Sequence, residues 1–340
     1  MKINKLFVLI LIGFGLLAGC GKPKNPETIE PITEPDGGYK IVAKLGTSAS
    51  AQDVVKRGDL LYMAQGEGGL LIVDVSDPTN PTVVNEITEG VRGYSAKIDF
   101  RDSIVYLAAG SYGISVVDVS DPMNPDINGW YVNLVKPAKN LHILGDFLFT
   151  AISEKGIQLV YVKKNLSLPA TRGDVITEGY ANGVTTSPDS TTMFVACGEM
   201  GLSVYDISDF QEGWGIFPRL GWCDTPGYAE TVVVNDQQSL AFLACGTEGL
   251  HIIDYADTAN IHRVGNFATE GFAKELIYEN QKIFITTGLR GLQIIDVANV
   301  AAPKIIGVVP TENARGFDMD EDYIYIADEV EGLVVISRPN

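Results

Sequence analysis

Carboxylates recur at two kinds of position along the chain, and clustered carboxylate oxygens are what a hard cation such as Ca²⁺ binds. One series follows threonine in Thr-Glu segments and comprises Glu89, Glu178, Glu270 and Glu312. The other series lies near the ends of apolar segments and comprises Glu67, Glu154, Glu199, Glu248 and Glu331. Solvated turns explain both series most simply. A basic or sugar-bearing partner and a Ca²⁺ site are the alternatives that the pattern leaves open.

Charged and amide side chains form a second group, which follows shortly after the acidic segments. Its members are Gln52, Asp53, Lys97, Lys139, Asn140, Asn182, Glu230, Lys274, Glu275 and Arg315. Aromatic residues stand two or three positions before four of them, at Tyr94, Tyr180, Tyr228 and Phe272. Gathered in one place, such groups can bind a polar ligand. Mutual neutralisation around a water-filled channel is the simpler interpretation.

The three histidines do not form a catalytic or metal-binding pattern. His142, His251 and His262 fall in three different types of predicted strand. Neither a metal cluster nor a Ser-His-Asp grouping follows from such spacing, so we assign no catalytic residue. A site made of a carboxylate and a lysine from the second group stays open.

The cysteines of the main domain are expected to stay reduced. Cys197 and Cys245 occupy equivalent positions in neighbouring repeats. Packed sheets lie about 10 Å apart, which exceeds the usual separation of disulfide-bonded Cα atoms. Cys223 lies on the connection between them and can reach one of the two in an oxidising compartment. Three buried thiols are the simpler expectation.

A repeated unit positions all of these side chains, at intervals of 41 to 48 residues. A glycine that opens an apolar strand marks each copy, at Gly69, Gly113, Gly156, Gly201, Gly249, Gly291 and Gly332. An aromatic residue stands seven positions earlier in every copy, at Tyr62, Tyr106, Phe149, Phe194, Phe242, Phe284 and Tyr325. Because this spacing never varies, we expect a fixed two-stranded hairpin in each copy.

Each copy reads as a four-stranded blade. In the second copy the strands fall at residues 96–100, 104–109 and 114–119 and around 130–134. Third strands such as 70–75 are apolar on both sides, so both of their faces must be covered. Stacked blades achieve this. The sequence therefore predicts an all-β fold, a seven-bladed β-propeller of four-stranded antiparallel blades.

The two ends of the repeat region complement each other. The seventh copy stops after its third strand at residues 337–340, whereas residues 39–45 read as an orphan fourth strand. We expect the N-terminal strand to complete the last blade, because closing the ring removes exposed sheet edges. The propeller domain then spans residues 39–340.

Propeller geometry brings the second group to the mouth of the central channel, where the innermost strands begin. The acidic series lies on the same face. Asp-x-Ser-Asp turns fall on the opposite face, with Asp74 and Asp77 in the first copy. Aspartate side chains accept backbone N–H groups in such turns, so we interpret these residues as structural.

Two segments carry a family resemblance. Residues 69–81 (Gly-Leu-Leu-Ile-Val-Asp-Val-Ser-Asp-Pro-Thr-Asn-Pro) and 116–125 (Val-Val-Asp-Val-Ser-Asp-Pro-Met-Asn-Pro) resemble the LVIVD repeat of bacterial and archaeal surface propellers. The match is looser elsewhere, since Tyr161 and Ser337 replace the aspartate in the third and seventh copies. The resemblance implies a propeller in the cell envelope and brings no established activity.

The N-terminus is typical of an export signal. Lys2 and Lys5 precede an apolar run at residues 6–17, which is too short for a comfortable membrane span. Residues 17–20, Leu-Ala-Gly-Cys, resemble the bacterial lipobox. We expect a signal peptide at 1–19, lipidation of Cys20 and a flexible Pro-rich and acidic tether at 20–38.

Lipid chains on Cys20 would hold the domain on a membrane. Gly21 follows the cysteine where an aspartate would resemble an inner-membrane retention signal, so the outer membrane is expected. Whether the domain faces the periplasm or the exterior stays open.

The charge of the chain limits its partners. The net charge is −18, and removal of residues 1–19 leaves 23 basic and 43 acidic residues. Such a field excludes nucleic acid, whose binding needs clustered Lys and Arg. We expect a monomeric, non-enzymatic envelope module that binds a protein or a glycan, with no cofactor other than Ca²⁺. A propeller hydrolase or lyase, Ca²⁺-assisted in one version, and a structural envelope component are the alternatives.

Overall fold

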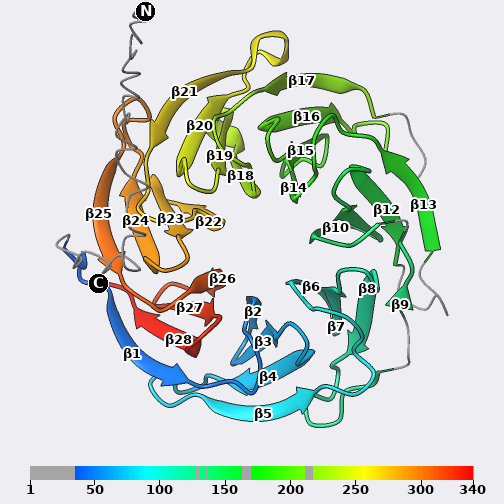
Figure 1. Ribbon diagram of the computed structural model, residues 1–340, viewed down its shortest axis with the longest axis vertical. Coiled ribbons are helices and arrows are strands. Elements are labelled where there is room, and N and C mark those ends of the chain that lie inside the picture. Colours follow the sequence, from blue (N-terminus) through cyan, green and yellow to red (C-terminus); the bar gives the residue numbers. More distant parts are fainter. Residues whose placement is uncertain (1–34, 128–130, 135, 163–169, 211–216, 340) are drawn as a thin grey trace, which may run out of the picture. The chain divides into compact units, whose positions relative to one another are not determined.

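Runs of β-branched, aliphatic and aromatic residues separated by glycine turns form seven four-stranded antiparallel sheets around a central axis (Figure 1). The computed structural model describes residues 35–127, 131–134, 136–162, 170–210 and 217–339. Six sheets follow the chain from inner to outer strand. The seventh has the order β26-β27-β28-β1 from inner to outer strand. The predicted seven-bladed propeller is confirmed.

The strands of the first three blades are short and closely spaced. They are β2 (Asp53–Arg57), β3 (Leu60–Ala64), β4 (Leu70–Asp74) and β5 (Thr82–Ile87), then β6 (Lys97–Arg101), β7 (Ile104–Ala108), β8 (Ile114–Asp118) and β9 (Tyr131–Val132), then β10 (Asn140–Leu144), β11 (Phe147–Ala151), β12 (Ile157–Tyr161) and β13 (Ala170–Val175). The outer strand β9 is shorter than predicted, and residues 128–130 lie outside the described residues.

The next three blades have the same plan, with two short 3₁₀ helices in their turns. Their elements are β14 (Gly183–Thr186), β15 (Thr192–Ala196), β16 (Leu202–Asp206) and β17 (Arg219–Cys223), then β18 (Thr231–Asn235), η1 (Asp236–Gln238), β19 (Leu240–Ala244), β20 (Leu250–Asp254), η2 (Thr258–Asn260) and β21 (His262–Phe267), then β22 (Glu275–Glu279), β23 (Lys282–Thr286), β24 (Leu292–Asp296) and β25 (Lys304–Val309). The last blade joins β26 (Ala314–Met319), β27 (Tyr323–Asp328) and β28 (Gly332–Ser337) to β1 (Lys40–Leu45).

The core consists of apolar layers between neighbouring blades. The second strand of every blade contributes the repeated aromatic residue, and Phe149, Phe194, Phe242, Phe284 and Tyr325 are fully buried. Phe194 of one blade packs in the same layer as Leu243 of the next. Each such ring contributes roughly 2 to 3 kcal/mol by burial. No blade can therefore be stable without both neighbours.

The repeated glycine is required by close backbone approach. Gly113 and Gly156 have φ values of 83° in the left-handed region. A Cβ atom on Gly113 would lie 1.9 Å from the carbonyl oxygen of Val132 in the outer strand. A Cβ atom on Gly156 would lie 2.1 Å from the carbonyl oxygen of Val175. Only glycine fits this conformation and this space, which explains the unvarying hairpin.

The N-terminal strand closes the ring, as predicted. Strand β1 pairs with β28 antiparallel from Lys40 opposite Ser337 to Leu45 opposite Leu333, with a bulge between Ile41 and Ala43. Tyr39 is buried just before it and packs edge-on against Phe284 of the sixth blade, with ring centroids 5.9 Å apart. The first and last parts of the propeller therefore share one sheet.

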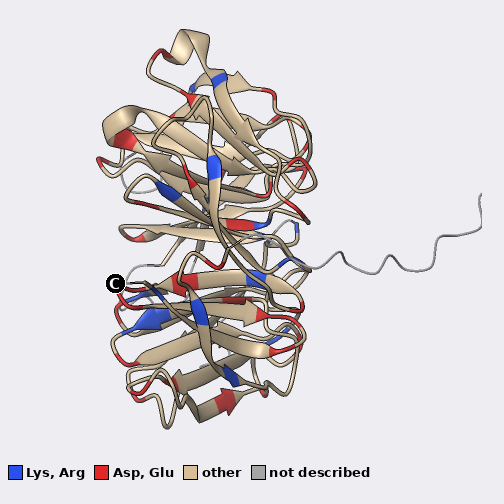
Figure 2. Ribbon diagram, turned by 90° about the vertical axis from the view of Figure 1, so that its left-hand side faces the viewer, with Lys and Arg blue, Asp and Glu red and all other residues tan. Residues whose placement is uncertain are grey.

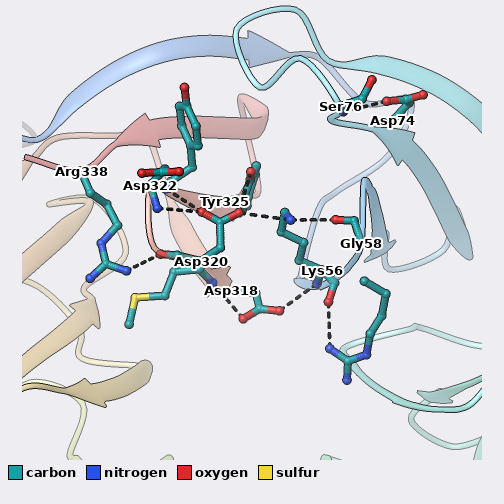
Figure 3. Close-up of polar contacts among 12 residues, drawn as sticks. Lys56, Gly58, Asp74, Ser76, Asp318, Asp320, Asp322, Tyr325 and Arg338 are labelled. Atoms are coloured by element: carbon teal, nitrogen blue, oxygen red, sulfur yellow. Dashed lines mark hydrogen bonds and ion pairs between the residues drawn. The ribbon is translucent and has the colours of Figure 1, made fainter. Parts of the chain in front are cut away.

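Charged side chains reinforce this junction on the face where the inner strands end (Figure 3). The backbone N–H of Lys56 donates to Asp318 at 2.8 Å, and the Lys56 ammonium lies 3.1 Å from Asp320. Asp320 also accepts the Tyr325 hydroxyl at 3.2 Å. The Arg338 guanidinium donates to the Asp320 carbonyl oxygen and pairs with the sixth blade through Glu279. We call these residues the closure network.

The repeated aspartate turns on that same face are structural, as predicted. The Oδ1 atom of Asp74 accepts the N–H of Ser76 at 2.8 Å, and Asp77 accepts the N–H of Thr79 at 3.0 Å. Asp118 repeats the first bond. Figure 2 shows acidic residues at turns along both faces of the ring.

The predicted signal peptide, Cys20 and most of the tether lie outside the described residues. Among the described residues, no helix is long and apolar enough to span a membrane.

Candidate functional site

The second group of polar residues gathers where the inner strands begin. Short backbone bridges fix these starts: Gly66 and Ser95 exchange N–H···O bonds of 3.0 and 2.9 Å, and equivalent bridges link the later blades. Inner strands begin at or just after these bridges. One polar residue at or next to each start makes up a set of seven, which we call the ring positions: Gln52, Lys97, Lys139, Asn182, Glu230, Lys274 and Arg315. Lys97 stands one register position later than the others, because it pairs with Ala108 as Asn140 pairs with Ala151.

A cavity of about 660 Å³ lies at this end of the axis. We call the cavity and its lining the funnel. Eight of the ten predicted residues line it, namely Gln52, Lys97, Lys139, Asn140, Asn182, Glu230, Lys274 and Glu275. Asp53 is buried and Arg315 turns to a partner in its own blade, so neither lines the cavity. The prediction that these residues surround the channel mouth agrees with the structure.

Lys97 forms an ion-pair cluster across the channel. Its ammonium lies 3.2 Å from Asp53 on β2 and 2.7 Å from Glu275 on β22. Strands β6 and β22 belong to blades that are not neighbours (Figure 1). Asp53 also accepts the N–H of Ile98 at 3.0 Å. A Cβ atom on Gly316 would lie 1.9 Å from Asp53, so glycine makes room for this carboxylate.

Burial and charge shift both members of this pair. Burial raises the pKa of Asp53 to about 6, although Lys97 and the Ile98 N–H act against this shift. Burial also disfavours the Lys97 ammonium, but two carboxylates outweigh this effect and hold the pKa of Lys97 above its usual value. The cluster therefore keeps Lys97 charged and fully engaged.

Three other funnel residues have no such partner. Lys139, Lys274 and Glu230 make neither a side-chain hydrogen bond nor an ion pair with any residue that the structure describes. Burial lowers the pKa of Lys274, and the nearby Arg315 charge lowers it further. Burial raises the pKa of Glu230, while Lys274 and Lys139 act in the opposite direction. These three side chains act on one another electrostatically but form no direct contact within the described protein.

The remaining ring positions serve the scaffold. Arg315 donates to Glu329 through Nε at 2.8 Å. Asn182 donates to the carbonyl oxygen of Ala229 at 2.9 Å, which links two blades. Gln52 donates to the Ser50 hydroxyl at 2.6 Å. The side-chain carbonyl oxygens of both amides stay available for other contacts.

Aromatic rings line one side of the funnel. Tyr94, Tyr180 and Tyr228 belong to the lining, and Tyr94 and Tyr180 are 42% and 50% exposed. The ring of Tyr94 lies against Gly66, where a Cβ atom would come within 2.9 Å of it. Phe272 is exposed to a similar degree but lies outside the lining.

Sequence reasoning missed seven further lining residues, namely Ala96, Gly110, Pro137, Ala138, Ser153, Thr231 and Gly316. The signal for Pro137 was present, because Pro137-Ala138-Lys139 aligns with Tyr180-Ala181-Asn182. The proline takes the place of the aromatic ring in that blade.

The acidic series lies on the funnel face but does not converge. Glu178 pairs with Arg219, and Glu270 lies 3.0 Å from Arg290. Of the hairpin carboxylates, Glu154 pairs with Lys136 and Glu331 with Lys44. Glu89 and Glu312 are exposed. The described residues bring together no group of three or more His, Cys, Asp or Glu side chains that could hold a metal ion. Ca²⁺ binding therefore stays a prediction.

The histidines lie apart from the funnel lining. The Nε2 atom of His142 is 2.9 Å from the Thr186 hydroxyl, and burial lowers the pKa of this imidazole. Burial lowers the pKa of His251 to about 4. His262 is exposed.

The cysteines of the described residues carry free thiols. Cys197 and Cys245 are buried, as expected, and Cys223 is half-buried. The alternative in which Cys223 forms a bridge is not realised in the structure.

Comparison with known families agrees with the geometry. The model of the LVIVD repeat matches residues 48–88, 93–132 and 313–337, which belong to the first, second and last blades. This chain carries LVIVD repeats. No curated protein matches the sequence. A crystal structure of the computationally designed Ika8 protein resembles this chain with a TM-score of 0.63, covering 88% of this chain and 100% of that chain. The two are 8% identical, so the likeness shows the fold alone.

The structure explains the aspartate of the LVIVD motif. In β4 and β8 it caps the strand by accepting an N–H two residues later. Tyr161 stands at the same register position in β12, opposite the start of β11, and Ser337 does so in β28. The blades that depart from the motif keep the strands and lose only this cap.

Proposed function

We propose that this LVIVD propeller is a non-enzymatic, envelope-tethered binding module whose ligand enters the funnel. One observation carries the proposal. Charged side chains that make no hydrogen bond or ion pair with a described residue line a cavity on the axis of the propeller. An unpaired charge in a partly buried place costs stability, so its retention favours a role toward something that binds there.

The dimensions of the funnel favour a glycan over a folded protein surface. Small-ligand sites typically have volumes of about 300 to 1,000 Å³ with a few polar groups and aromatic walls. A cavity of about 660 Å³ falls within that range. A flat protein face cannot enter such a cavity, whereas a sugar chain or a chain end can.

The N-terminal sequence supports the tether. Residues 17–20 have the Leu-Ala-Gly-Cys pattern of a lipidation signal, so we propose that acyl chains on Cys20 hold the propeller on the outer membrane. Replacing Cys20 by serine is expected to release the protein from membranes, as measured by fractionation and palmitate labelling. Unchanged labelling in C20S would refute the anchor.

Glycan-array binding tests the function. The propeller is expected to bind a subset of glycans, and the Lys139→Glu/Lys274→Glu variant is expected to lose them. Lys155→Glu makes the same type of charge reversal on an exposed turn of the same face and is the matched control. If Lys139→Glu/Lys274→Glu still binds the same glycans, the funnel is not the binding site.

A hydrolase stays the second candidate because of Glu230. A buried carboxyl with a raised pKa beside a lysine is the kind of group that acts as a general acid. Incubation with a bound glycan would reveal cleavage, and Glu230→Gln would abolish it. Recovery of the intact glycan would exclude this candidate.

A further inference from the structure

The ring positions have a charge opposite to that of the whole chain. Four are basic and one is acidic, since Lys97, Lys139, Lys274 and Arg315 stand against Glu230. The chain as a whole carries a net charge of −18. Basic residues are thus concentrated around a cavity of an acidic protein. The cavity lining itself carries Lys97, Lys139 and Lys274 against Glu230 and Glu275, a small positive excess that favours anions over the strongly acidic rest of the surface.

Two of the four cations are neutralised by the protein and two are not. Lys97 is held by Asp53 and Glu275, and Arg315 is held by Glu329. Lys274 has Arg315 and Lys97 as neighbouring positive charges and Glu230 and Glu275 as neighbouring negative charges. Among the described residues, no acceptor lies within hydrogen-bonding distance of its ammonium. Lys139 stands exposed on the other side of Glu230. An anionic group placed beside Lys274 would relieve this repulsion and complete its hydrogen bonding.

The aromatic lining indicates what carries the anion. Tyr94, Tyr180 and Tyr228 offer flat faces to the same cavity. Sugar rings pair an apolar C–H face with a hydroxyl edge, so they match a wall of tyrosine rings next to amide oxygens. Asn182 and Gln52 retain free side-chain carbonyl oxygens for such hydroxyls.

We propose that the funnel binds a carboxylate-bearing saccharide, with the carboxylate at Lys274 and Lys139 and the sugar rings against the tyrosines. This inference rests on the proposed function, because it names the ligand class of the same site. Glu230 stands between the two lysines and accepts a sugar hydroxyl in this arrangement. An acidic peptide is the competing ligand, and it lacks the ring faces that the three tyrosines would contact.

Calorimetric titration of the propeller with trisaccharides tests the inference. The probes are trimers of galacturonate, glucuronate and mannuronate, each beside its carboxyl-reduced neutral counterpart. At least one acidic trimer is expected to bind at least about tenfold more tightly than its neutral counterpart, because a hydrogen bond to a charged group is lost in the latter. The preference is expected to shrink as salt is added.

Variants of the funnel lysines test which side chains cause the preference for the acidic trimer. Lys139→Gln/Lys274→Gln is expected to reduce the preference to less than about twofold, whereas Lys155→Gln on the same face is expected to keep it. The side chains of both lysines make no hydrogen bond with a described residue, so the double variant is expected to melt like the parent. Its melting temperature therefore separates loss of the ligand from loss of the fold.

Three outcomes would overturn the inference. Equal binding of acidic and neutral trimers would refute the carboxylate while leaving glycan binding in the funnel intact. Binding of hexaglutamate as tightly as the best trimer would assign the funnel to acidic peptides. If no acidic trimer binds, the inference fails, and the glycan array decides separately whether the proposed function survives.

Discussion

The two ends of the propeller axis use lysine in opposite ways. In the closure network, the Lys56 ammonium lies 3.1 Å from Asp320 and donates to the carbonyl oxygen of Gly58 at 2.7 Å. In the funnel, Lys274 has no hydrogen bond or ion pair with a described residue. Both are half-buried charges on inner strands or at their starts. Lys56 therefore stabilises the fold, whereas the side chain of Lys274 stays available for a bound ligand.

Removal of β1 should have the largest effect on the closed end. Deleting residues 39–46 removes the outer strand of the last blade together with Tyr39, and it exposes the edge of β28. We expect loss of cooperative unfolding and aggregation, an effect as large as the whole stability of a domain, about 5 to 15 kcal/mol. Light scattering and thermal melting would measure it. Lys40→Gln, an exposed change in the same strand, should melt like the parent. A soluble deletion variant with normal melting would refute the closure.

Lys97 lies in the funnel, but its replacement should destabilise the fold, as replacement of a residue of the closure network does. Lys97→Met leaves Asp53 buried without a cation, so we expect a loss of about 3 to 5 kcal/mol in the free energy of unfolding. Adding Asp53→Asn should recover part of this loss, because the asparagine oxygen can still accept the Ile98 N–H. Urea denaturation of the two variants checks both statements. An unchanged K97M midpoint would show that the cluster across the channel does not stabilise the fold.

The two ends should also respond to pH with opposite signs. The pKa of Asp53 is raised to about 6 from 3.8, so the folded state binds this proton more tightly than the unfolded state. Its contribution to stability therefore grows as pH falls from about 6 to about 4, by roughly 2 to 3 kcal/mol. Hydrogen bonds from Ser76 and Ser208 hold the pKa of Asp74 and Asp206 below the usual value. The contribution of these turns is present above about pH 4 and is lost below it.

Denaturation of the parent and D53N across this range separates the two kinds of carboxylate. The D53N variant should lose the rise in stability between pH 6 and 4 and keep the fall at lower pH. Parallel curves for the two proteins would contradict the raised pKa of Asp53.

The closure network allows a smaller and sharper test. Asp320 accepts the N–H groups of Asp322 and Tyr323 at 3.0 and 2.8 Å and also contacts Lys56 and Tyr325. Asp320→Ala should cost about 2 kcal/mol, since the carboxylate is partly exposed and its bonds are only partly replaced by water. Asp322→Ala, an exposed carboxylate in the same turn, should change stability by less than about 0.5 kcal/mol. Equal effects of the two changes would contradict the network.

Most of the fold was predictable because it rests on local rules that repeat. The glycine after each second strand admits no side chain, so the spacing of these glycines indicates the hairpins directly. The seventh copy has only three strands of its own, up to residue 337, and this predicted that the strand beginning at residue 40 completes it. The ring positions followed, since each lies at or next to the start of an inner strand. Strand β9 is shorter than predicted, since only Tyr131 and Val132 pair with β8 among the described residues.

The partners of long side chains were not predictable. Lys97 reaches Glu275 across the channel, and that contact depends on the channel width and on four side-chain torsions rather than on spacing. Arg315 has the same ring position as Lys274, yet Glu329 in its own blade neutralises it. Spacing alone therefore placed all four cations in one ring without telling the two paired ones from the two unpaired ones.

We infer that the unpaired funnel charges are kept for a ligand at the expense of stability, and the Lys274→Met variant is the sharpest test of this inference. Urea titrations of K274M, with and without a glycan that the parent binds, measure the free energy of unfolding and its increase in the presence of the glycan. We expect the free energy of unfolding to stay equal or rise by up to about 1 kcal/mol, because a disfavoured ammonium is removed, and the stabilisation by the glycan to disappear. A K274M protein that is less stable than the parent and still stabilised by the glycan would contradict the claim.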